Sequence, residues 1–137
     1  MLANGAKLGY KVKDSGGDYK DLPGLKEIPE IGVEPEKVDN TVLTDPFKKN
    51  EIGIGELPDM VYKFKYDNSG ADSPYRVLRE HQDAGEVLSF QETLKDGTIT
   101  EYDANISVKR TGGGVNGVID FDVTMYVQSD IKVTDPA

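Results

Sequence analysis

The sequence of 137 residues contains no cysteine, no tryptophan and only one histidine. The lack of cysteine excludes disulfides, thiolate nucleophiles and thiolate metal ligands, and a single histidine leaves little imidazole chemistry. Positive charge is also scarce. The sequence has 16 Lys and Arg residues and 25 Asp and Glu residues, which gives a formal net charge of −9. This balance argues against a nucleic-acid-binding surface, which needs clustered Lys and Arg.

Long hydrophobic runs are absent as well. No apolar stretch approaches the roughly 20 residues of a membrane-spanning helix, and the start, Met1–Gly5, lacks the basic and apolar regions of a signal peptide. We therefore expect a soluble, unsecreted chain without a membrane partner. The length fits a single core and the composition shows no sharp shift, so we expect one domain over residues 1–137.

Alternating apolar and polar residues recur along the chain and predict β-strands with one buried face. These stretches are Lys7–Lys13, Met60–Tyr66, Val87–Leu94, Thr98–Arg110 and Val118–Gln128. Between the third and the fourth stretch, Lys95-Asp96-Gly97 supplies the turn of a hairpin. The last stretch alternates strictly, which is typical of a central core strand.

A single helix is predicted at Ser73–Ala84. Ser73 suits the N-cap, Pro74 suits the first helical position, and Gly85 can close the end in the left-handed conformation. The helix is short, and we expect it to cover a sheet. The sequence thus predicts an all-β sandwich or barrel of antiparallel strands, with one flanking α-helix at about residues 73–84 and a long loop at about residues 39–57.

The loop at residues 39–57 is too long and too poorly patterned for a hairpin turn, and structureless loops beyond about 12–15 residues are usually functional or disordered. A solvated linker would not carry its large apolar residues. These residues are Val42, Leu43, Phe47, Ile52, Ile54 and Leu57. They either fold back on their own domain or contact a neighbouring subunit. The second alternative is favoured, because an arm that reaches a neighbour satisfies both its side chains and its backbone.

Two pairs of carboxylates share a strand face and could bind a cation or act as acid and base. They are Glu101 with Asp103 and Asp120 with Asp122, and a solvated strand face explains both pairs better. His81 lies on the apolar stripe of the predicted helix, without a Ser or Cys nucleophile motif, so we assign it a packing or capping role. We predict no catalytic residue, no cofactor and no metal site.

Three segments define the layout of the chain. They are Leu22-Pro23-Gly24-Leu25-Lys26-Glu27-Ile28-Pro29, then Lys37-Val38-Asp39-Asn40-Thr41 up to Asp45, and Gly55-Glu56-Leu57-Pro58-Asp59. An aromatic strand, one helix, and a closing hairpin and strand follow them. Over nearly its whole length, this layout resembles the tail tube proteins (major tail proteins) of long-tailed bacteriophages. The resemblance implies a β-sandwich or barrel that assembles into stacked six-fold rings, as a virion structural protein without catalytic residues.

The resemblance also implies partners and a location. Copies of the chain would form the ring and the hollow tube, with tape measure and tail terminator or tail tip proteins as further partners. DNA would pass through the tube into the host without specific binding. The location would be the virion tail, after assembly in the host cytoplasm. The loop residues would contact the adjacent subunit or ring.

The acidic strand face is the candidate lining of the tube lumen, because negative charge would keep passing DNA from sticking. Its carboxylates are those of Glu101, Asp103, Asp120 and Asp122.

Three alternatives stay open. The sequence does not distinguish a phage tube from the tube of a phage-derived injection or secretion particle. A ligand-binding β-sandwich would use tyrosines as stacking platforms for a carbohydrate or protein, from among Tyr62, Tyr66, Tyr75 and Tyr102. An acid/base enzyme would use the paired carboxylates.

Overall fold

The computed structural model describes residues 1–32, 34–39, 50–56 and 59–137. The chain divides into two compact units. Residues 1–29 and 60–137 form the larger one, which we call the sheet unit, and residues 30–59 form the second, which we call the hairpin unit.

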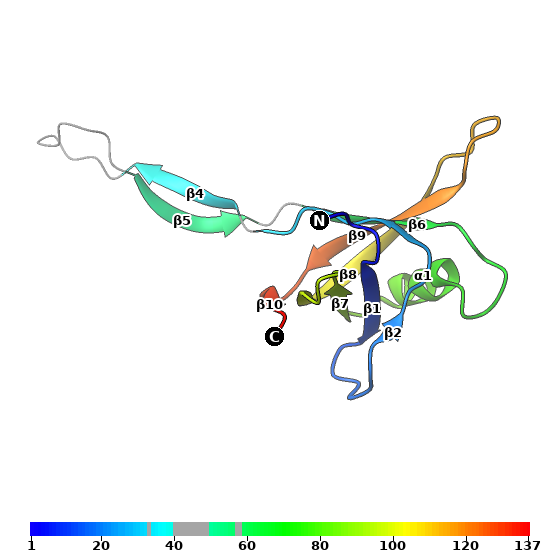
Figure 1. Cartoon of the computed structure of the whole chain (residues 1–137), viewed down its shortest axis with the longest axis horizontal. Coiled ribbons are helices and arrows are strands. Elements are labelled where there is room, and N and C mark those ends of the chain that lie inside the picture. The colour runs from blue at the N-terminus through cyan, green and yellow to red at the C-terminus, as the bar shows by residue number, and fades with distance from the viewer. Residues whose placement is uncertain (33, 40–49, 57–58) are drawn as a thin grey trace, which may run out of the picture. The chain divides into compact units, whose positions relative to one another are not determined.

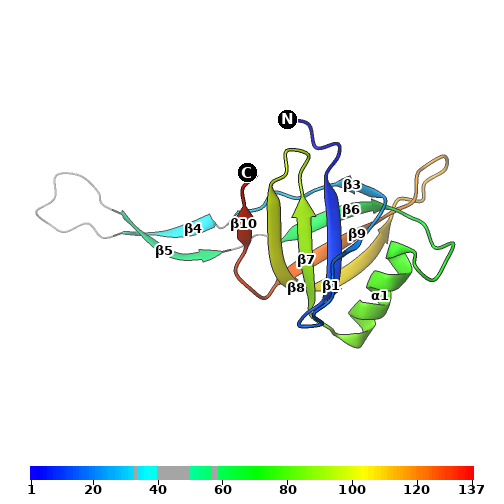
Figure 2. The same cartoon turned by 60° about the horizontal axis from the view of Figure 1, so that its bottom comes forward.

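The sheet unit contains one antiparallel sheet that curls into a half-barrel (Figures 1 and 2). Along the sheet the strands follow the order β2-β1-β7-β8-β9-β6-β3, and β10 pairs with the first part of β8. The strands are β1 (Lys7–Val12), β2 (Lys20–Asp21), β3 (Leu25–Glu27), β6 (Met60–Lys65), β7 (Leu88–Thr93), β8 (Ile99–Thr111), β9 (Asp120–Val127) and β10 (Lys132–Thr134). The prediction of antiparallel strands with one short helix is confirmed.

Strict alternation places the apolar residues of β9 on the buried side of the curled sheet. Phe121 and Val123 are fully buried and Met125 nearly so, whereas Tyr126 on the opposite face is half-exposed. The same alternation holds in β8, where Tyr102 is buried. Because a strand side chain changes face at every residue, this pattern fixes which side of the sheet forms the core.

Aromatic rings fill the centre of that core. Phe64 on β6 stacks on Phe121 of the neighbouring strand, with ring centroids 5.3 Å apart and an interplanar angle of 11°. Tyr75 meets the ring of Phe121 edge-on, at 5.3 Å. Burial of such large apolar side chains is the main stabilising contribution in a domain of this size.

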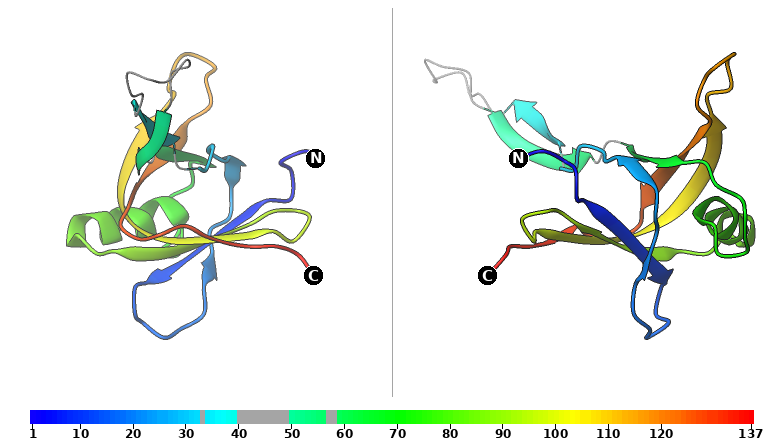
Figure 3. Two further views of the ribbon diagram at one scale, coloured as in Figure 1. Left: turned by 90° about the vertical axis from the view of Figure 1, so that its left-hand side faces the viewer. Right: turned by 45° about the vertical axis from the view of Figure 1, so that its right-hand side comes forward.

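Helix α1 (Pro74–Ala84) lies against the sheet (Figure 3). Pro74 opens it and Gly85 closes it with a left-handed φ of 69°, as the sequence predicted. Ser73 stands at the N-cap position, but its hydroxyl accepts a hydrogen bond from the backbone N–H of Gly70 and does not cap the helix. Leu78 is the fully buried anchor of the helix.

The helix also covers the part of β8 that runs beyond the end of β7. Pairing between these two strands ends at Leu88 and Ala104. Further along β8, the backbone N–H of Val108 donates to the side-chain oxygen of Gln82 on α1. The side chain of Gln82 thus satisfies a backbone donor that no β7 residue reaches.

The hairpin unit differs from the loop expected at residues 39–57. Its strands β4 (Glu34–Asp39) and β5 (Asn50–Glu56) pair antiparallel, from Glu34 opposite Glu56 to Asp39 opposite Asn50, with a register shift after Pro35 (Figure 1). The prediction of a loop over residues 50–56 is therefore wrong. The proline and the glycines in these strands obscured the alternation, because both residue types are unfavourable in a strand interior.

The aromatic core predicts a large effect for one truncation. Replacing the ring in Phe121→Ala should lower the free energy of unfolding by about 3–5 kcal/mol, the usual cost of emptying a buried aromatic site. Chemical denaturation followed by circular dichroism measures this change. Tyr126→Ala removes a ring of similar size from the polar face of the same strand and should cost less than about 1 kcal/mol. Equal losses in the two variants would contradict the assignment of the core face.

Candidate assembly surfaces

The hairpin unit offers free strand edges. In the part of the chain that the structure describes, β4 and β5 form a two-stranded sheet and pair with no third strand. Each strand therefore has one edge whose backbone groups lack a strand partner, and such edges are templates for pairing with another chain. An isolated two-stranded hairpin is marginal in water, so a further partner would stabilise it.

The structure places the predicted contact residues of the loop only in part. Ile52 and Ile54 belong to β5. Val42, Leu43, Phe47 and Leu57 lie outside the described residues. Their assignment to a subunit contact stays a prediction.

The four carboxylates of the candidate lumen lining do share the polar face of the sheet. Glu101 and Asp103 lie on β8, and Asp120 and Asp122 lie on β9. The register separates the two pairs, because Asp122 stands opposite Lys109, well beyond Asp103 on β8. The sheet thus brings each pair to a different part of the same face. Which face lines a lumen stays a prediction.

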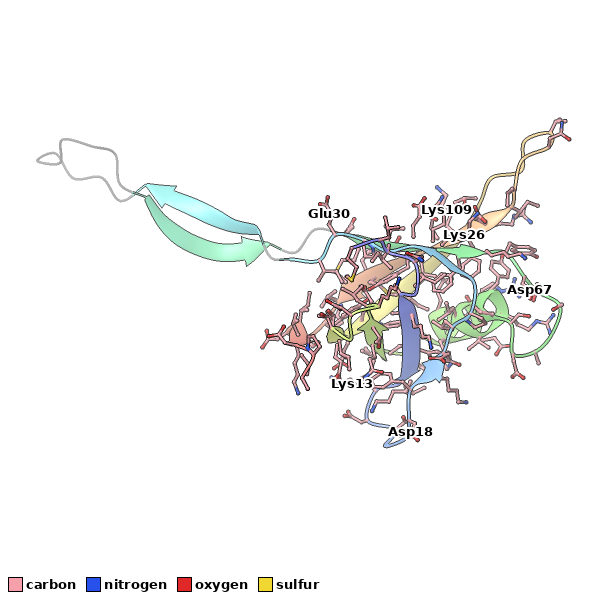
Figure 4. All side chains as sticks on the ribbon, in the orientation of Figure 1. Lys13, Asp18, Lys26, Glu30, Asp67 and Lys109 are labelled. Carbon is pink, nitrogen blue, oxygen red and sulfur yellow. The ribbon has the colours of Figure 1, made fainter. Side chains whose placement is uncertain are left out.

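Lysines accompany these carboxylates. Lys26 Nζ lies 3.1 Å from a carboxylate oxygen of Asp120, Lys63 Nζ lies 3.7 Å from Asp122 and Lys13 Nζ lies 4.0 Å from Asp103. Lys13, Lys26 and Lys109 are labelled in Figure 4. The carboxylates therefore stand in a face of mixed charge, on which the lysines offset part of the negative field. Each such pair is partly exposed and contributes little to stability by itself.

Alternation along β6 indicates the face on which its two lysines lie. Lys63 and Lys65 alternate with the core residues of β6, so they had to point to the polar face. The strand order β9-β6 then sets Lys63 directly opposite Asp122 and Lys65 opposite Asp120. Without the strand order, the sequence identifies the face but not the partner.

A buried chain of hydrogen bonds crosses the core beside β7. The hydroxyl of Tyr102 donates to the hydroxyl of Tyr62 at 2.9 Å, and that of Tyr62 donates to a carboxylate oxygen of Glu92 at 2.5 Å. Glu92 is only 4% exposed. This buried carboxylate could not be predicted from the sequence, because alternation assigns Glu92 to a face but does not identify the tyrosine that binds it across the core.

Burial determines the acid–base properties of this chain. Desolvation raises the pKa of Glu92 above its ordinary value, and the hydrogen bond from Tyr62 opposes that rise. Desolvation also raises the pKa of Tyr62, helped by Tyr102 and Glu92, and it raises the pKa of Tyr102. Both hydroxyls thus stay protonated and act as donors.

The tyrosines bear on the ligand-binding alternative. Tyr62 and Tyr102 are buried in the core, so neither can serve as a stacking platform for a ligand. Tyr66 and Tyr75 contact each other edge-on, with ring centroids 4.9 Å apart. Their rings are therefore already engaged in packing.

His81 has the packing role that the sequence predicted. Its ring meets Tyr10 edge-on at 5.8 Å, and its Nδ1 lies 2.9 Å from a carboxylate oxygen of Glu86. Among the described residues, no group of three or more His, Asp and Glu side chains is placed to hold a metal ion. Over the same residues, no helix is long and apolar enough to cross a membrane.

Comparison with known proteins yields structural relatives only. No family model and no curated protein matches the sequence. A solved chain from the tail of an empty gene transfer agent particle, determined by helical refinement with C6 symmetry, has a TM-score of 0.68 at 22% identity, over 93% of this chain and 95% of that one. A chain from the virion of the native particle has a TM-score of 0.66 at 21% identity, with the same coverage.

A third solved relative belongs to a different particle. A chain in the six-fold symmetrised baseplate of the anti-feeding prophage has a TM-score of 0.68 at 9% identity, over 98% of this chain and 95% of that one. The protein thus has the fold of tail components of phage-like particles. The resemblance to tail tube proteins that the sequence predicted is confirmed at the level of the fold.

The buried carboxylate predicts a pH effect. Because the folded state raises the pKa of Glu92, the folded state binds the proton more tightly, and stability should fall as pH rises from the ordinary Glu value of 4.5 through the raised value. Glu92→Gln keeps a carbonyl oxygen for the Tyr62 hydroxyl and cannot ionise. Its free energy of unfolding should exceed that of the wild type at neutral pH and change less between pH 5 and pH 8. Denaturant titrations at several pH values measure this difference.

Glu80→Gln provides the control, because Glu80 is an exposed carboxylate on α1. Its stability profile should run parallel to that of the wild type. A parallel profile for Glu92→Gln as well would contradict the raised pKa.

Proposed function

We propose that this protein is a non-enzymatic structural subunit of a tail tube. Copies of the whole chain, residues 1–137, act as one tail-tube-like domain and assemble into stacked rings of six. The rings form a hollow tube through which DNA passes without specific binding. Tape measure and tail terminator or tail tip proteins are the further partners, and the assembly site is the host cytoplasm.

The fold supports this proposal most directly. The likeness extends over more than nine-tenths of this chain and of each solved tail component. It therefore includes at least part of the hairpin unit as well as most of the sheet unit. A chain that matches a component of a helically refined, C6-symmetric tail over most of its length is well suited to repeat in the same manner.

The hairpin unit supplies the means of self-association in this proposal. Its two strands have free edges in the described part of the chain, and in β5 Ile52 and Ile54 alternate with Gly53 and Gly55. A strand from a second copy would satisfy such an edge. Val42, Leu43, Phe47 and Leu57 complete the proposed contact.

The polar face of the sheet is the proposed lumen lining. Its carboxylates Asp120 and Asp122 are held beside Lys26 and Lys63, so passing DNA would meet fixed charges of both signs. Such a wall attracts a polyanion less than a basic groove does. DNA can then slide past without a site that retains it.

A second candidate is the tube subunit of a phage-derived injection particle. One specific observation favours it, namely the likeness to the baseplate chain of the anti-feeding prophage, with a TM-score of 0.68. In that case an effector would replace DNA as the cargo. The assembly of the subunits would follow the same contacts.

Replacement of the hairpin unit tests the assembly role. Glu34 stands opposite Glu56, so a Gly-Ser linker of about four residues can replace residues 34–56 and still join the flanking segments. The sheet unit should stay folded, with a melting temperature close to that of the wild type, because its core lies in residues 1–29 and 60–137. Electron microscopy should show tubes for the wild type and none for the variant. Tubes formed by the variant would refute the role of the hairpin unit.

The apolar contribution needs a narrower test. Ile52→Ser combined with Ile54→Ser removes the two large apolar side chains of β5 and should raise the protein concentration at which tubes appear. Glu51→Ser combined with Glu56→Ser is the matched control on the same strand and should leave tube formation in place. Light scattering as a function of protein concentration measures tube formation by both variants. If the two double variants change tube formation equally, the isoleucine side chains make no specific contribution to the contact.

A further inference from the structure

The loop that joins β8 to β9 exposes apolar side chains within the sheet unit. Val115 is 97% exposed, Val118 66% and Ile119 41%. The loop stands at the end of the long β8–β9 hairpin (Figure 1). Exposed valines at a turn are unusual, since Gly, Asn, Asp, Ser and Pro are the residues that turns favour. A contact outside the subunit would remove these side chains from water.

The loop has a defined shape. The backbone N–H of Gly117 donates to the carbonyl of Gly114 at 2.8 Å, which closes a turn with Val115 at its first corner. Gly112 has a φ of 84°, and a Cβ at this position would lie 2.2 Å from the carbonyl oxygen of Val118. Only glycine fits there without moving the backbone. The apolar tip is thus built into the fold.

The same unit contains a cleft of about 330 Å³, lined by apolar residues together with Lys7 and Asp21. The start of β1 and the connection from β2 to β3 line it, and its apolar residues include the buried Leu8 and Leu22 as well as Pro23 and Leu25. Val115 is almost fully exposed, so the tip does not occupy the cleft of its own subunit. The tip and the cleft lie on different strands and do not share residues.

We propose that the tip, Val115 and Val118, inserts into this cleft on a second copy of the chain. The identification of the partner rests on the proposed function, in which copies repeat. A tip and a cleft at different places on one subunit make a head-to-tail contact, which closes into a ring or continues as a filament. The contact is small compared with the roughly 1,000 Å² of a stable interface, so it adds specificity to the larger contact of the hairpin unit.

Cysteine cross-linking tests this contact, because the wild type contains no cysteine. Val115→Cys is prepared in one full-length protein and Lys7→Cys, at the rim of the cleft, in another that carries a mass tag. The two are mixed, assembled and mildly oxidised, and a non-reducing gel measures the mixed disulfide dimer. The control replaces Lys7→Cys by Glu80→Cys, on the exposed side of α1. We expect at least tenfold more mixed dimer with Lys7→Cys than with Glu80→Cys.

The outcomes separate this contact from the proposed function. Equal yields in the two mixtures, in tubes seen by electron microscopy, would overturn the tip-in-cleft contact and leave the tail tube function standing. A dominant dimer of Val115→Cys with itself would also overturn it, because that contact is two-fold symmetric. If the wild type forms neither rings nor tubes under any condition, both proposals fall.

A charged tip gives a second test that does not depend on oxidation. Val115→Asp changes a fully exposed side chain, so the monomer should unfold at the same temperature as the wild type. The concentration at which assembly begins should rise at least tenfold, since the cleft would have to bury a carboxylate. Val133→Asp introduces the same charge at an exposed valine of β10 and should shift assembly much less. Equal shifts would show a general charge effect and overturn the contact.

Discussion

The structure depends on one constraint, the strict alternation of apolar and polar side chains along β8 and β9. These strands form the middle of the sheet, and in the core Phe121 of β9 meets the rings of Phe64 and Tyr75 while Tyr102 of β8 meets the ring of Phe90. Because a slip of one residue would exchange the two faces, alternation fixes the register and the side that remains polar. The polar face is then available for a role that requires contact with water and ions.

Two kinds of polar group follow from this division. On the outer face, carboxylates such as Asp120 stand beside lysines and keep contact with solvent. In the core, Glu92 has no such partner and relies on the hydroxyl of Tyr62. Charges near water lose little hydration on folding and stabilise the fold weakly. A buried carboxylate loses its hydration, which is unfavourable, and makes the stability depend on pH. A carboxylate thus has opposite consequences on the two faces.

Much of the sheet unit could be predicted from the sequence, because alternation, the Lys95-Asp96-Gly97 turn and the Pro74 and Gly85 ends of α1 are local signals. The non-local features of the structure could not be predicted from the sequence. The opposition of Lys63 and Asp122 depends on strand order, and the link from Tyr62 to Glu92 depends on packing across the core. In β5, glycines interrupt the pattern, so a strand was interpreted as loop. The packing role of His81 was predictable because no partner for catalysis stands near it in the sequence.

The proline in β4 has a consequence for the time before assembly. Pro35 has no N–H to donate, and the register shifts directly after it. A strand with a missing donor and a shifted register is a poor template for the endless stacking that produces amyloid fibres. In the proposed tube subunit, this irregularity would limit uncontrolled strand-to-strand pairing of free copies through β4.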